Sequence, residues 1–451
     1  MRGAPGRTLS TLTPRGHCLV GGGATLALVG AVLGEQPLVQ LALFVLALPL
    51  LAALTVLRGR FRVTTRRQVT PQRLPRGGVA EVALQLGNTD TRRGGLWLLT
   101  EQLPPALGQG HRFSVAGLAP GAATTVRYTL AGRHRGDYVL GPLQLRVVDP
   151  FGLVERTVAG TDTAPLTVVP RVRPLGPGGP GGGHGRGGDG ARRAIAVHGD
   201  DDVSVREYRR GDDLRKVHWR ATARTGELMV RLEERPWRAQ GTLLLDTRSR
   251  AHLVVPARDA GRPVPGPPGD DCPPGDSLEW LVEAAASIGV SLAQRGAELR
   301  VVTDTGELPP AAGRTGLGAD ELLDRLAGVG PSRAGSLRPA ISTAARAAGD
   351  GPLICLLGAV GPDDVADLVQ LRPGPVTDLA ILLDITGWAG NGPGRAGRMG
   401  SGAARDALSA QREQAAALLS GAGWRVTTAT AGQDVAAAWA ALGGVRSGAP
   451  A

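Results

Sequence analysis

The sequence predicts a multi-domain protein with an N-terminal transmembrane helical hairpin, a β-sandwich-like domain and a C-terminal α/β doubly wound domain. Two apolar stretches near the N-terminus, short alternating runs after them and apolar strands between amphipathic helices after residue 240 support this prediction. The 451 residues allow two or three domains, at roughly 150 residues per domain. The predicted order is hairpin (1–60), β-sandwich-like domain (61–173), Gly/Pro-rich linker (174–192), polar segment (193–240) and α/β domain (241–445).

The hairpin is predicted from residues 18–33 and 38–57, which are apolar and separated by four residues. A bilayer core needs about 20 apolar residues per helix, with a lower limit of about 17. The second stretch meets this requirement and the first is marginal. A cleaved signal peptide is disfavoured because a second apolar stretch follows where a polar mature start is expected.

Flanking charge predicts the orientation of the hairpin. The turn at 34–37 has no basic residue, whereas arginines gather at both outer ends. Because basic residues favour the cytoplasmic side, both ends are predicted to be cytoplasmic. The flanking arginines are Arg2, Arg7 and Arg15 before the first helix and Arg58, Arg60, Arg62, Arg66 and Arg67 after the second.

The composition indicates cores of Leu, Val and Ala, since 42% of the residues are hydrophobic and only 3% aromatic. A net charge of +11 makes nucleic acid an alternative partner, but Lys216 is the only lysine, so arginine-rich coding bias explains the charge better. No base-stacking module appears, and nucleic acid is not predicted as a partner. Cys18, Cys272 and Cys355 show no disulfide or zinc spacing, which fits a reducing compartment.

Short strands and then a glycine-rich stretch follow the hairpin. Gly, Pro, Asn and Asp separate the strands, a pattern typical of an all-β sandwich. The linker contains a GxGxxG spacing at Gly183, Gly185 and Gly188, which we interpret as chance because no strand precedes it. The predicted strands are 80–86, 96–100, 125–130, 138–148 and 166–169.

From residue 241 the pattern alternates between apolar strands and amphipathic helices. This alternation predicts a parallel sheet covered on both faces. A Pro-rich stretch at 256–276 is predicted to be an exposed loop. The predicted strands are 242–245, 298–303, 353–357, 379–384 and 424–428, and the predicted helices are 277–294, 319–326, 403–419 and 435–442.

The polar segment at 203–237 predicts a strand, a capped helix and a second strand. One hypothesis for it is a hydrolase in which Asp212 or Asp213 and His218 exchange protons. Helix capping and ion pairing explain these carboxylates better, because the helix dipole stabilises them at a helix start. His198 with the aspartates at 200–202 is an alternative metal site, but a solvated loop edge is favoured. No catalytic residue, metal ligand or cofactor is predicted.

This segment resembles the signature of the bacterial family called domain of unknown function 58 (DUF58). The resemblance extends to residues 135–153 and to the paired N-terminal helices. The matching signature residues, which we take as the candidate interaction residues, are Arg206, Glu207, Tyr208, Gly211, Asp212, Asp213, Arg215, His218, Trp219, Ala223 and Arg224.

The resemblance implies a membrane protein with no assigned reaction and a von Willebrand factor A-like domain that begins with the strand ending at Asp246. It implies a MoxR-type AAA+ ATPase and a transglutaminase-like membrane protein as partners. Metal-binding members of the wider fold hold a divalent cation with Asp-x-Ser-x-Ser. Here Arg248 and Arg250 occupy the two hydroxyl positions and are expected to bring positive charge where a cation would sit, so no functional metal site is expected. The predicted function is partner binding or scaffolding at the membrane. The protein is not expected to be an enzyme.

Overall fold

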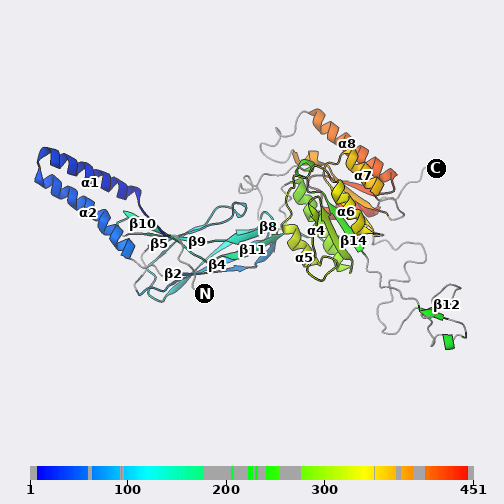
Figure 1. Cartoon of the computed structure of the whole chain (residues 1–451), viewed down its shortest axis with the longest axis horizontal. Coiled ribbons are helices and arrows are strands. Elements are labelled where there is room, and N and C mark those ends of the chain that lie inside the picture. Colours follow the sequence, from blue (N-terminus) through cyan, green and yellow to red (C-terminus); the bar gives the residue numbers. More distant parts are fainter. Residues whose placement is uncertain are drawn as a thin grey trace. The chain divides into compact units, whose positions relative to one another are not determined.

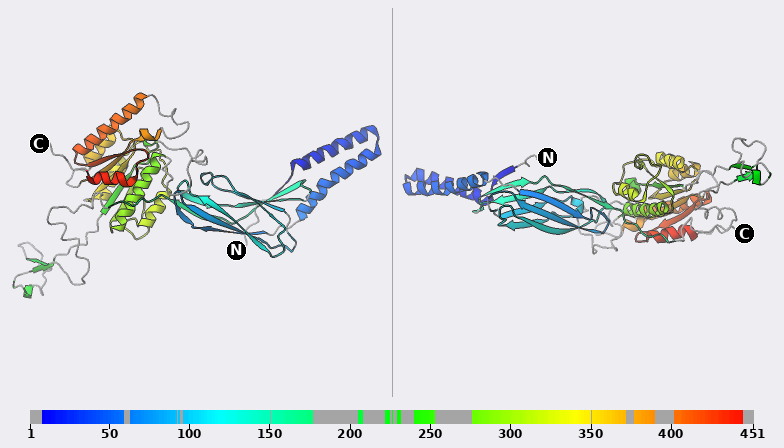
Figure 2. Two further views of the ribbon diagram at one scale, coloured as in Figure 1. Left: turned by 180° about the vertical axis from the view of Figure 1, so that it is seen from behind. Right: turned by 90° about the horizontal axis from the view of Figure 1, so that it is seen from below.

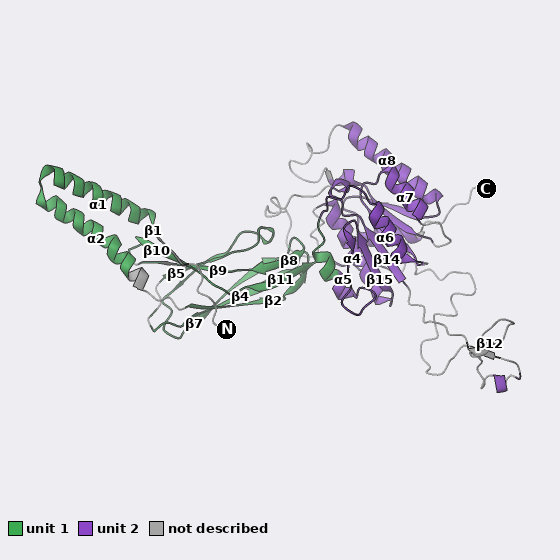
Figure 3. Cartoon of the chain, in the orientation of Figure 1, with its two compact units in different colours: residues 1–171, 254–275, 323–330 green, residues 172–253, 276–322, 331–451 purple. Residues whose placement is uncertain are grey.

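The computed structural model forms two compact units, drawn in different colours in Figure 3. Unit 1 comprises residues 1–171, 254–275 and 323–330, and unit 2 comprises residues 172–253, 276–322 and 331–451. The structure describes residues 8–58, 63–91, 93, 96–149, 151–176, 205–207, 222–224, 226, 229–231, 240–252, 276–349, 351–371, 377–389 and 402–444.

Two antiparallel helices, α1 (Pro14–Leu33) and α2 (Gln36–Arg58), form a hairpin in unit 1 (Figure 1). Both are long and apolar enough to cross a membrane. The Thr13 side chain caps α1 by accepting from the backbone N–H of Gly16, and Gly34 ends α1 at a φ of 73°. Since α1 begins at Pro14 and has 20 residues, it is longer than the marginal stretch seen in the sequence.

The two helices pack closely because glycines of α1 face α2. Gly23 and Gly30 are buried and lie seven residues apart. A Cβ atom at Gly23 would lie 2.9 Å from the Leu46 side chain, and one at Gly30 would lie 3.0 Å from Cβ of Leu38. Small residues at such positions let two helix backbones approach within van der Waals contact.

Eleven of the described strands, β1 to β11, form the β body of unit 1. They make a five-stranded sheet in the order β1-β10-β9-β5-β6 and two three-stranded sheets, β2-β4-β7 and β3-β11-β8. The strands are β1 (Thr8–Leu12), β2 (Val63–Thr70), β3 (Arg73–Pro75), β4 (Val79–Asn88), β5 (Leu96–Glu101), β6 (Arg112–Ala116), β7 (Ala123–Ala131), β8 (Gly136–Leu140), β9 (Leu143–Val148), β10 (Val154–Ala159) and β11 (Ala164–Val169).

The three sheets share one apolar core. Leu84 of β4, Leu99 of β5 and Leu166 of β11 are almost fully buried in it. The alternating burial of β4 explains why its apolar and polar residues alternate in the sequence. A buried ion pair also links two sheets, since Arg67 of β2 lies 2.9 Å from the Glu101 carboxylate at the end of β5.

The β body departs from the prediction in two places. The predicted strand at 138–148 is wrong as a single strand, because Gly141 and Pro142 separate β8 from β9. The sequence also gave no sign of β1, which pairs antiparallel with β10, Thr8 opposite Val158 and Leu12 opposite Val154. The chain therefore enters the hairpin from one strand of the β body and leaves it toward another, β2.

Unit 2 contains a six-stranded sheet in the order β16-β15-β14-β17-β18-β19. All neighbouring pairs are parallel except the edge strand β16, which is antiparallel to β15. The predicted bounds of β15 and β17 are confirmed. The strands are β14 (Gln240–Leu245), β15 (Glu298–Thr303), β16 (Gly306–Glu307), β17 (Leu353–Leu357), β18 (Leu379–Leu383) and β19 (Arg425–Ala429).

Helices cover both faces of this sheet, as Figure 2 shows. On one face α6, α7 and α8 pack with the strands around a core that includes Leu244, Ile341 and Leu419. On the other face α4 contacts α9. Both β17 and β18 are buried along their whole length, which explains their continuous apolar sequences. The helices of unit 2 are α4 (Ser277–Gln294), α6 (Arg338–Ala348), α7 (Pro362–Leu371), α8 (Gly402–Gly421) and α9 (Val435–Gly444). Helix α5 (Ala319–Ala327) begins in unit 2, and its residues from 323 onward are assigned to unit 1.

Candidate functional site

The structure describes only part of the predicted signature segment. Strands β12 (Val205–Glu207) and β13 (Met229–Arg231) pair antiparallel, with Arg206 opposite Val230. Ala223 and Arg224 are exposed in a short helical stretch. The two outer strands of the predicted unit therefore lie side by side. The residues outside the described part are Tyr208, Gly211, Asp212, Asp213, Arg215, His218 and Trp219, together with His198, the aspartates at 200–202 and the GxGxxG glycines.

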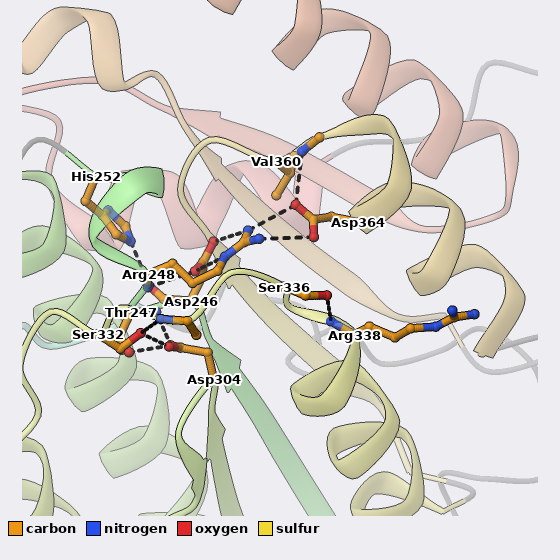
Figure 4. A network of polar contacts seen from close by, with 12 residues as sticks. Asp246, Thr247, Arg248, His252, Asp304, Ser332, Ser336, Arg338, Val360 and Asp364 are labelled. Atoms are coloured by element: carbon orange, nitrogen blue, oxygen red, sulfur yellow. Dashed lines mark hydrogen bonds and ion pairs between the residues drawn. The ribbon is translucent and has the colours of Figure 1, made fainter.

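The described residues bring polar side chains together at the carboxyl edge of the unit 2 sheet. The strand order reverses between β14 and β17, and ligands of doubly wound sheets bind at such a reversal. Three aspartates each follow a strand directly at this edge: Asp246 after β14, Asp304 after β15 and Asp384 after β18. We define the carboxyl-edge cluster as Asp246, Thr247, Arg248, His252, Asp304, Ser332 and Asp364 (Figure 4).

Arg248 lies at the centre of the cluster between two carboxylates. Its Nε and one terminal nitrogen donate to the two oxygens of Asp246, both at 2.9 Å. Its terminal nitrogens also donate to the two oxygens of Asp364, both at 3.1 Å. Asp364 lies in the first turn of α7 and accepts from the backbone N–H of Gly361 at 3.1 Å. The guanidinium therefore joins β14 to α7 through two bidentate contacts.

Burial and charge act in opposite directions on Arg248, whose side chain is 1% exposed. Burial favours loss of the proton, but the hydrogen bonds and charges of Asp246 and Asp364 outweigh burial and raise the pKa of Arg248 above its ordinary value. The guanidinium remains charged as the internal counterion of both carboxylates.

Asp304 holds the loop that follows β14. One of its oxygens accepts from the backbone N–H of Thr247 at 2.8 Å and from the Thr247 hydroxyl. Its second oxygen accepts from the Ser332 hydroxyl. Backbone hydrogen bonds join the same segments, from Ser332 to Thr247 and from Ser249 to Ser332, each at 2.8 Å. Asp304 therefore fixes the loop in place through donors of this same chain.

His252 connects the end of β14 to the start of α4. Its Nε2 lies 2.7 Å from the carbonyl oxygen of Asp246, and its Nδ1 lies 3.2 Å from the Ser277 hydroxyl. Burial lowers the pKa of His252 below 6.5, although the Asp246 charge opposes this effect. A carbonyl only accepts, so the neutral ring carries its proton on Nε2 and accepts from Ser277 on Nδ1.

Asp384 is also paired within the chain. One of its oxygens accepts from the backbone N–H of Thr386 at 3.2 Å and from its hydroxyl at 2.6 Å. The other oxygen lies 2.8 Å from the Arg412 guanidinium. These three residues line a small pocket over the ends of β17 and β18, whose other lining residues are Gly358, Ala359, Val360, Leu383, Ile385, Leu408 and Gln411.

The geometry does not fit a divalent cation at the Asp246 position. Both Asp246 oxygens already accept from Arg248, whose guanidinium lies where a bound cation would contact the carboxylate. The expectation that Arg250 also brings charge into the site is wrong, because Arg250 is exposed in a short 3-10 turn, Ser249–Ala251. In the described part of the chain, no group of three or more His, Cys, Asp or Glu side chains is arranged to hold a metal.

The sequence did not identify Asp304, Ser332, His252 or Asp364 as neighbours of Asp246. The partner of Arg248 on α7 is 116 residues away in sequence, and no spacing rule connects them. A usable signal existed for Asp304 and Asp384, since each is a polar residue directly after an apolar strand of a doubly wound fold.

Comparisons with known proteins add one family match. The family "Protein of unknown function DUF58" matches residues 204–254, a segment that runs from β12 through β14 to His252. No curated protein matches the chain.

Several solved structures show a low similarity. The CARDB domain of the PF1109 protein from Pyrococcus furiosus is 14% identical, with 25% of this chain and 98% of that chain covered and a TM-score of 0.20. The alkylpurine DNA glycosylase AlkC of Pseudomonas fluorescens is 18% identical, with 30% and 40% covered and a TM-score of 0.17. A β-glucosidase from Listeria innocua is 14% identical, with 24% and 16% covered and a TM-score of 0.17. At these TM-scores none of them supports a functional conclusion.

Proposed function

We propose, with the DUF58 match as premise, that this protein is a membrane-anchored partner-binding or scaffold protein. The α1–α2 hairpin crosses the bilayer with both of its ends on the cytoplasmic side. A von Willebrand factor A-like domain in unit 2, with the signature segment, presents a binding surface to a MoxR-type AAA+ ATPase. A transglutaminase-like membrane protein is a second partner of the same assembly.

The single observation that carries this proposal is that three aspartates at the carboxyl edge of the unit 2 sheet are paired with donors of the same chain. Asp246, Asp304 and Asp384 follow three neighbouring or near-neighbouring strands where an α/β enzyme places its reacting groups. Each of them accepts hydrogen bonds from the chain itself, through Arg248, Ser332 and Arg412 or adjacent donors. Carboxylates held in this way stabilise loops and the surface they form.

The hairpin supports the membrane part of the proposal. Both helices are long and apolar enough to span a bilayer, and the strands before and after them, β1 and β2, belong to the same β body. A chain that crosses twice returns to its starting side, which fits this arrangement. The arginines at both outer ends favour the cytoplasmic side.

The only lysine of the chain gives a selective test of the ATPase interaction. Lys216 lies inside the signature segment, so an amine-reactive crosslinker applied to native membranes attaches there and at the N-terminus. We expect the tagged full-length chain to form a crosslinked product that contains a MoxR-type ATPase.

The matched control is Lys216→Arg, which keeps the positive charge and removes the reactive amine. We expect the product to decrease at least tenfold in this variant. A product of unchanged yield in Lys216→Arg, or the absence of the ATPase from the product of the unmodified chain, contradicts the proposed role of the signature segment.

A further inference from the structure

The β9–β10 loop, described at Asp149 and at residues 151–153, lies at one end of the helical hairpin. The backbone N–H of Thr13, the residue that caps α1, donates to the carbonyl oxygen of Leu153 at 2.9 Å. The Thr13 hydroxyl donates to the carbonyl oxygen of Gly152 at 2.6 Å. A Cβ atom at Gly16 would lie 2.3 Å from the Leu153 carbonyl oxygen, so only glycine permits this close contact.

Apolar packing holds the same loop against both helices. Leu153 and Val154 are buried with Ala52 of α2, and Leu19 of α1 and Leu48 of α2 pack against them. The loop is thereby fixed to the base of the hairpin by hydrogen bonds on one helix and by side-chain contacts on both.

Helix length gives the depth of this contact in a bilayer. At 1.5 Å per residue, the 20 residues of α1 span about 30 Å, which is about the thickness of the hydrocarbon core. If α1 crosses the membrane, Thr13 lies at the boundary between lipid tails and headgroups. The loop bonded to Thr13 lies at the same depth.

The Asp149 carboxylate holds the described loop residues, and Phe151 beside it is exposed. The Asp149 carboxylate accepts from the backbone N–H groups of Phe151 at 2.9 Å, Leu153 at 2.6 Å and Val154 at 2.6 Å. The Phe151 side chain is nevertheless 68% exposed. Arg15, in the first turn of α1, is exposed beside the loop, where a cation is disfavoured by the helix dipole.

We propose that Phe151 and Arg15 form a lipid-contacting anchor at the base of the hairpin, in which Phe151 inserts among the lipid tails and Arg15 contacts headgroup phosphates. The inference rests on the proposed membrane-spanning hairpin and is continuous with it. Aromatic side chains favour the membrane interface, and arginine reaches headgroups while its stem stays in apolar surroundings. The anchor fixes the β body against the membrane surface.

Tryptophan quenching by brominated lipids tests the anchor. Full-length Phe151→Trp and unmodified protein are reconstituted in phosphatidylcholine and phosphatidylglycerol vesicles whose tails carry bromine close to the headgroup or deep in the tail. The seven native tryptophans give the background that is subtracted. We expect bromine close to the headgroup to reduce the emission of the added tryptophan at least twofold, and deep bromine to reduce it less.

The matched control is Val139→Trp, at a side chain that is 60% exposed on β8. Figure 1 shows β8 at the end of the β body away from α1 and α2, so we expect no quenching there. Equal quenching of the two variants overturns the anchor. A blue-shifted but unquenched Phe151→Trp signal also overturns it, because a second copy or another protein then covers the ring.

Alkaline carbonate extraction of the same vesicles separates this failure from failure of the proposed function. A chain retained in the vesicles without quenching overturns only the anchor. A chain released into the supernatant overturns both the anchor and the membrane-spanning hairpin.

Discussion

Arg248 sets the charge of the carboxyl-edge cluster at the scale of a single residue. Replacing it by alanine leaves the buried carboxylates of Asp246 and Asp364 without their cation. Breaking such a buried pair costs about 3–5 kcal/mol, so we expect Arg248→Ala to lower the apparent melting temperature of unit 2. This melting temperature is measured from the tryptophan fluorescence of the full chain during heating in detergent. Trp280, Trp388 and Trp424 lie in unit 2 and contribute to the signal.

Arg250→Ala is the control for this change. Its side chain is exposed two residues away, and surface substitutions of this kind stay within about 0.5 kcal/mol. Equal losses of melting temperature in the two variants contradict the assigned role of Arg248.

His252 gives a pH dependence whose sign follows from its lowered pKa. The unfolded chain binds the proton near pH 6.5, whereas the folded chain binds it only at lower pH. As the pH falls through 6.5, the unfolded state therefore gains protons, and this residue removes stability at up to about 1.4 kcal/mol per pH unit until the folded pKa is reached. Asp246, Asp276 and Arg248 are the charged groups that act on the ring.

Melting temperatures of the unmodified chain and of His252→Gln at pH 7.5, 6.5 and 5.5 check this dependence. We expect a weaker decline with acid in His252→Gln, because the amide keeps a donor toward Asp246 and does not titrate. An identical decline in both proteins shows that other groups cause it.

Residue-level prediction from the sequence succeeded where a motif named a position and failed where partners come from distant segments. Arg248 was singled out from its place two residues after Asp246, and the structure pairs its guanidinium with both oxygens of that aspartate. The prediction that Arg250 brings charge into the site was wrong, because the chain turns after Arg248 and leaves Ser249 and Arg250 exposed to solvent. The pairing of Arg248 with Asp364 could not be predicted from the sequence, because it depends on how α7 packs on the sheet.

Helix packing in the hairpin supports a prediction at the scale of elements. Gly23→Ile places a branched side chain where a Cβ alone already lies 2.9 Å from Leu46. Overpacking of this kind costs about 1–3 kcal/mol, so we expect a lower aggregation temperature of the full chain in detergent.

Gly21→Ile is the matched control, because nothing lies within 4 Å of a Cβ atom built there. It adds the same side chain to the same helix on an open face. If the aggregation temperature falls equally in both variants, an effect of the added side chain outside the α1–α2 contact accounts for the loss.

Elements with long apolar or amphipathic sequences were predictable, including the alanine-rich α8 and α9, and two shorter helices were not. The predicted bounds of α4 and β17 are confirmed. Asp276 caps α4 by accepting from the backbone N–H of Glu279, and β17 is a continuous run of Leu, Ile and Cys. The sequence pattern did not predict the helices α6 and α7. Four of the five buried residues of α6 are alanines, which give little contrast between its buried and exposed faces.

For the whole molecule, the return of the chain to one β body allows a direct test of the hairpin. Ser10 of β1 lies opposite Arg156 of β10, and residues opposite each other in antiparallel strands lie close enough for a disulfide. With the native cysteines replaced by alanine, we expect Ser10→Cys with Arg156→Cys to crosslink in oxidised membrane vesicles. A mobility shift on a non-reducing gel measures it.

The control pair is Ser10→Cys with Ser114→Cys, because Ser114 lies on β6 at the opposite edge of the same sheet. This pair should stay reduced. Absence of the Ser10–Arg156 crosslink, with the chain intact in the membrane, places the two segments apart and contradicts the arrangement of β1 in the β body.

The pairing of β1 with β10 has a consequence for biogenesis. During translation β1 leaves the ribosome before α1 and α2, but its partner strand β10 begins only at residue 154. At about 5–20 residues per second, the N-terminal strand waits roughly 7 to 30 seconds with an open hydrogen-bonding edge. With the proposed membrane-spanning hairpin, the β body is completed only after insertion, when this waiting strand docks as one of its last pieces.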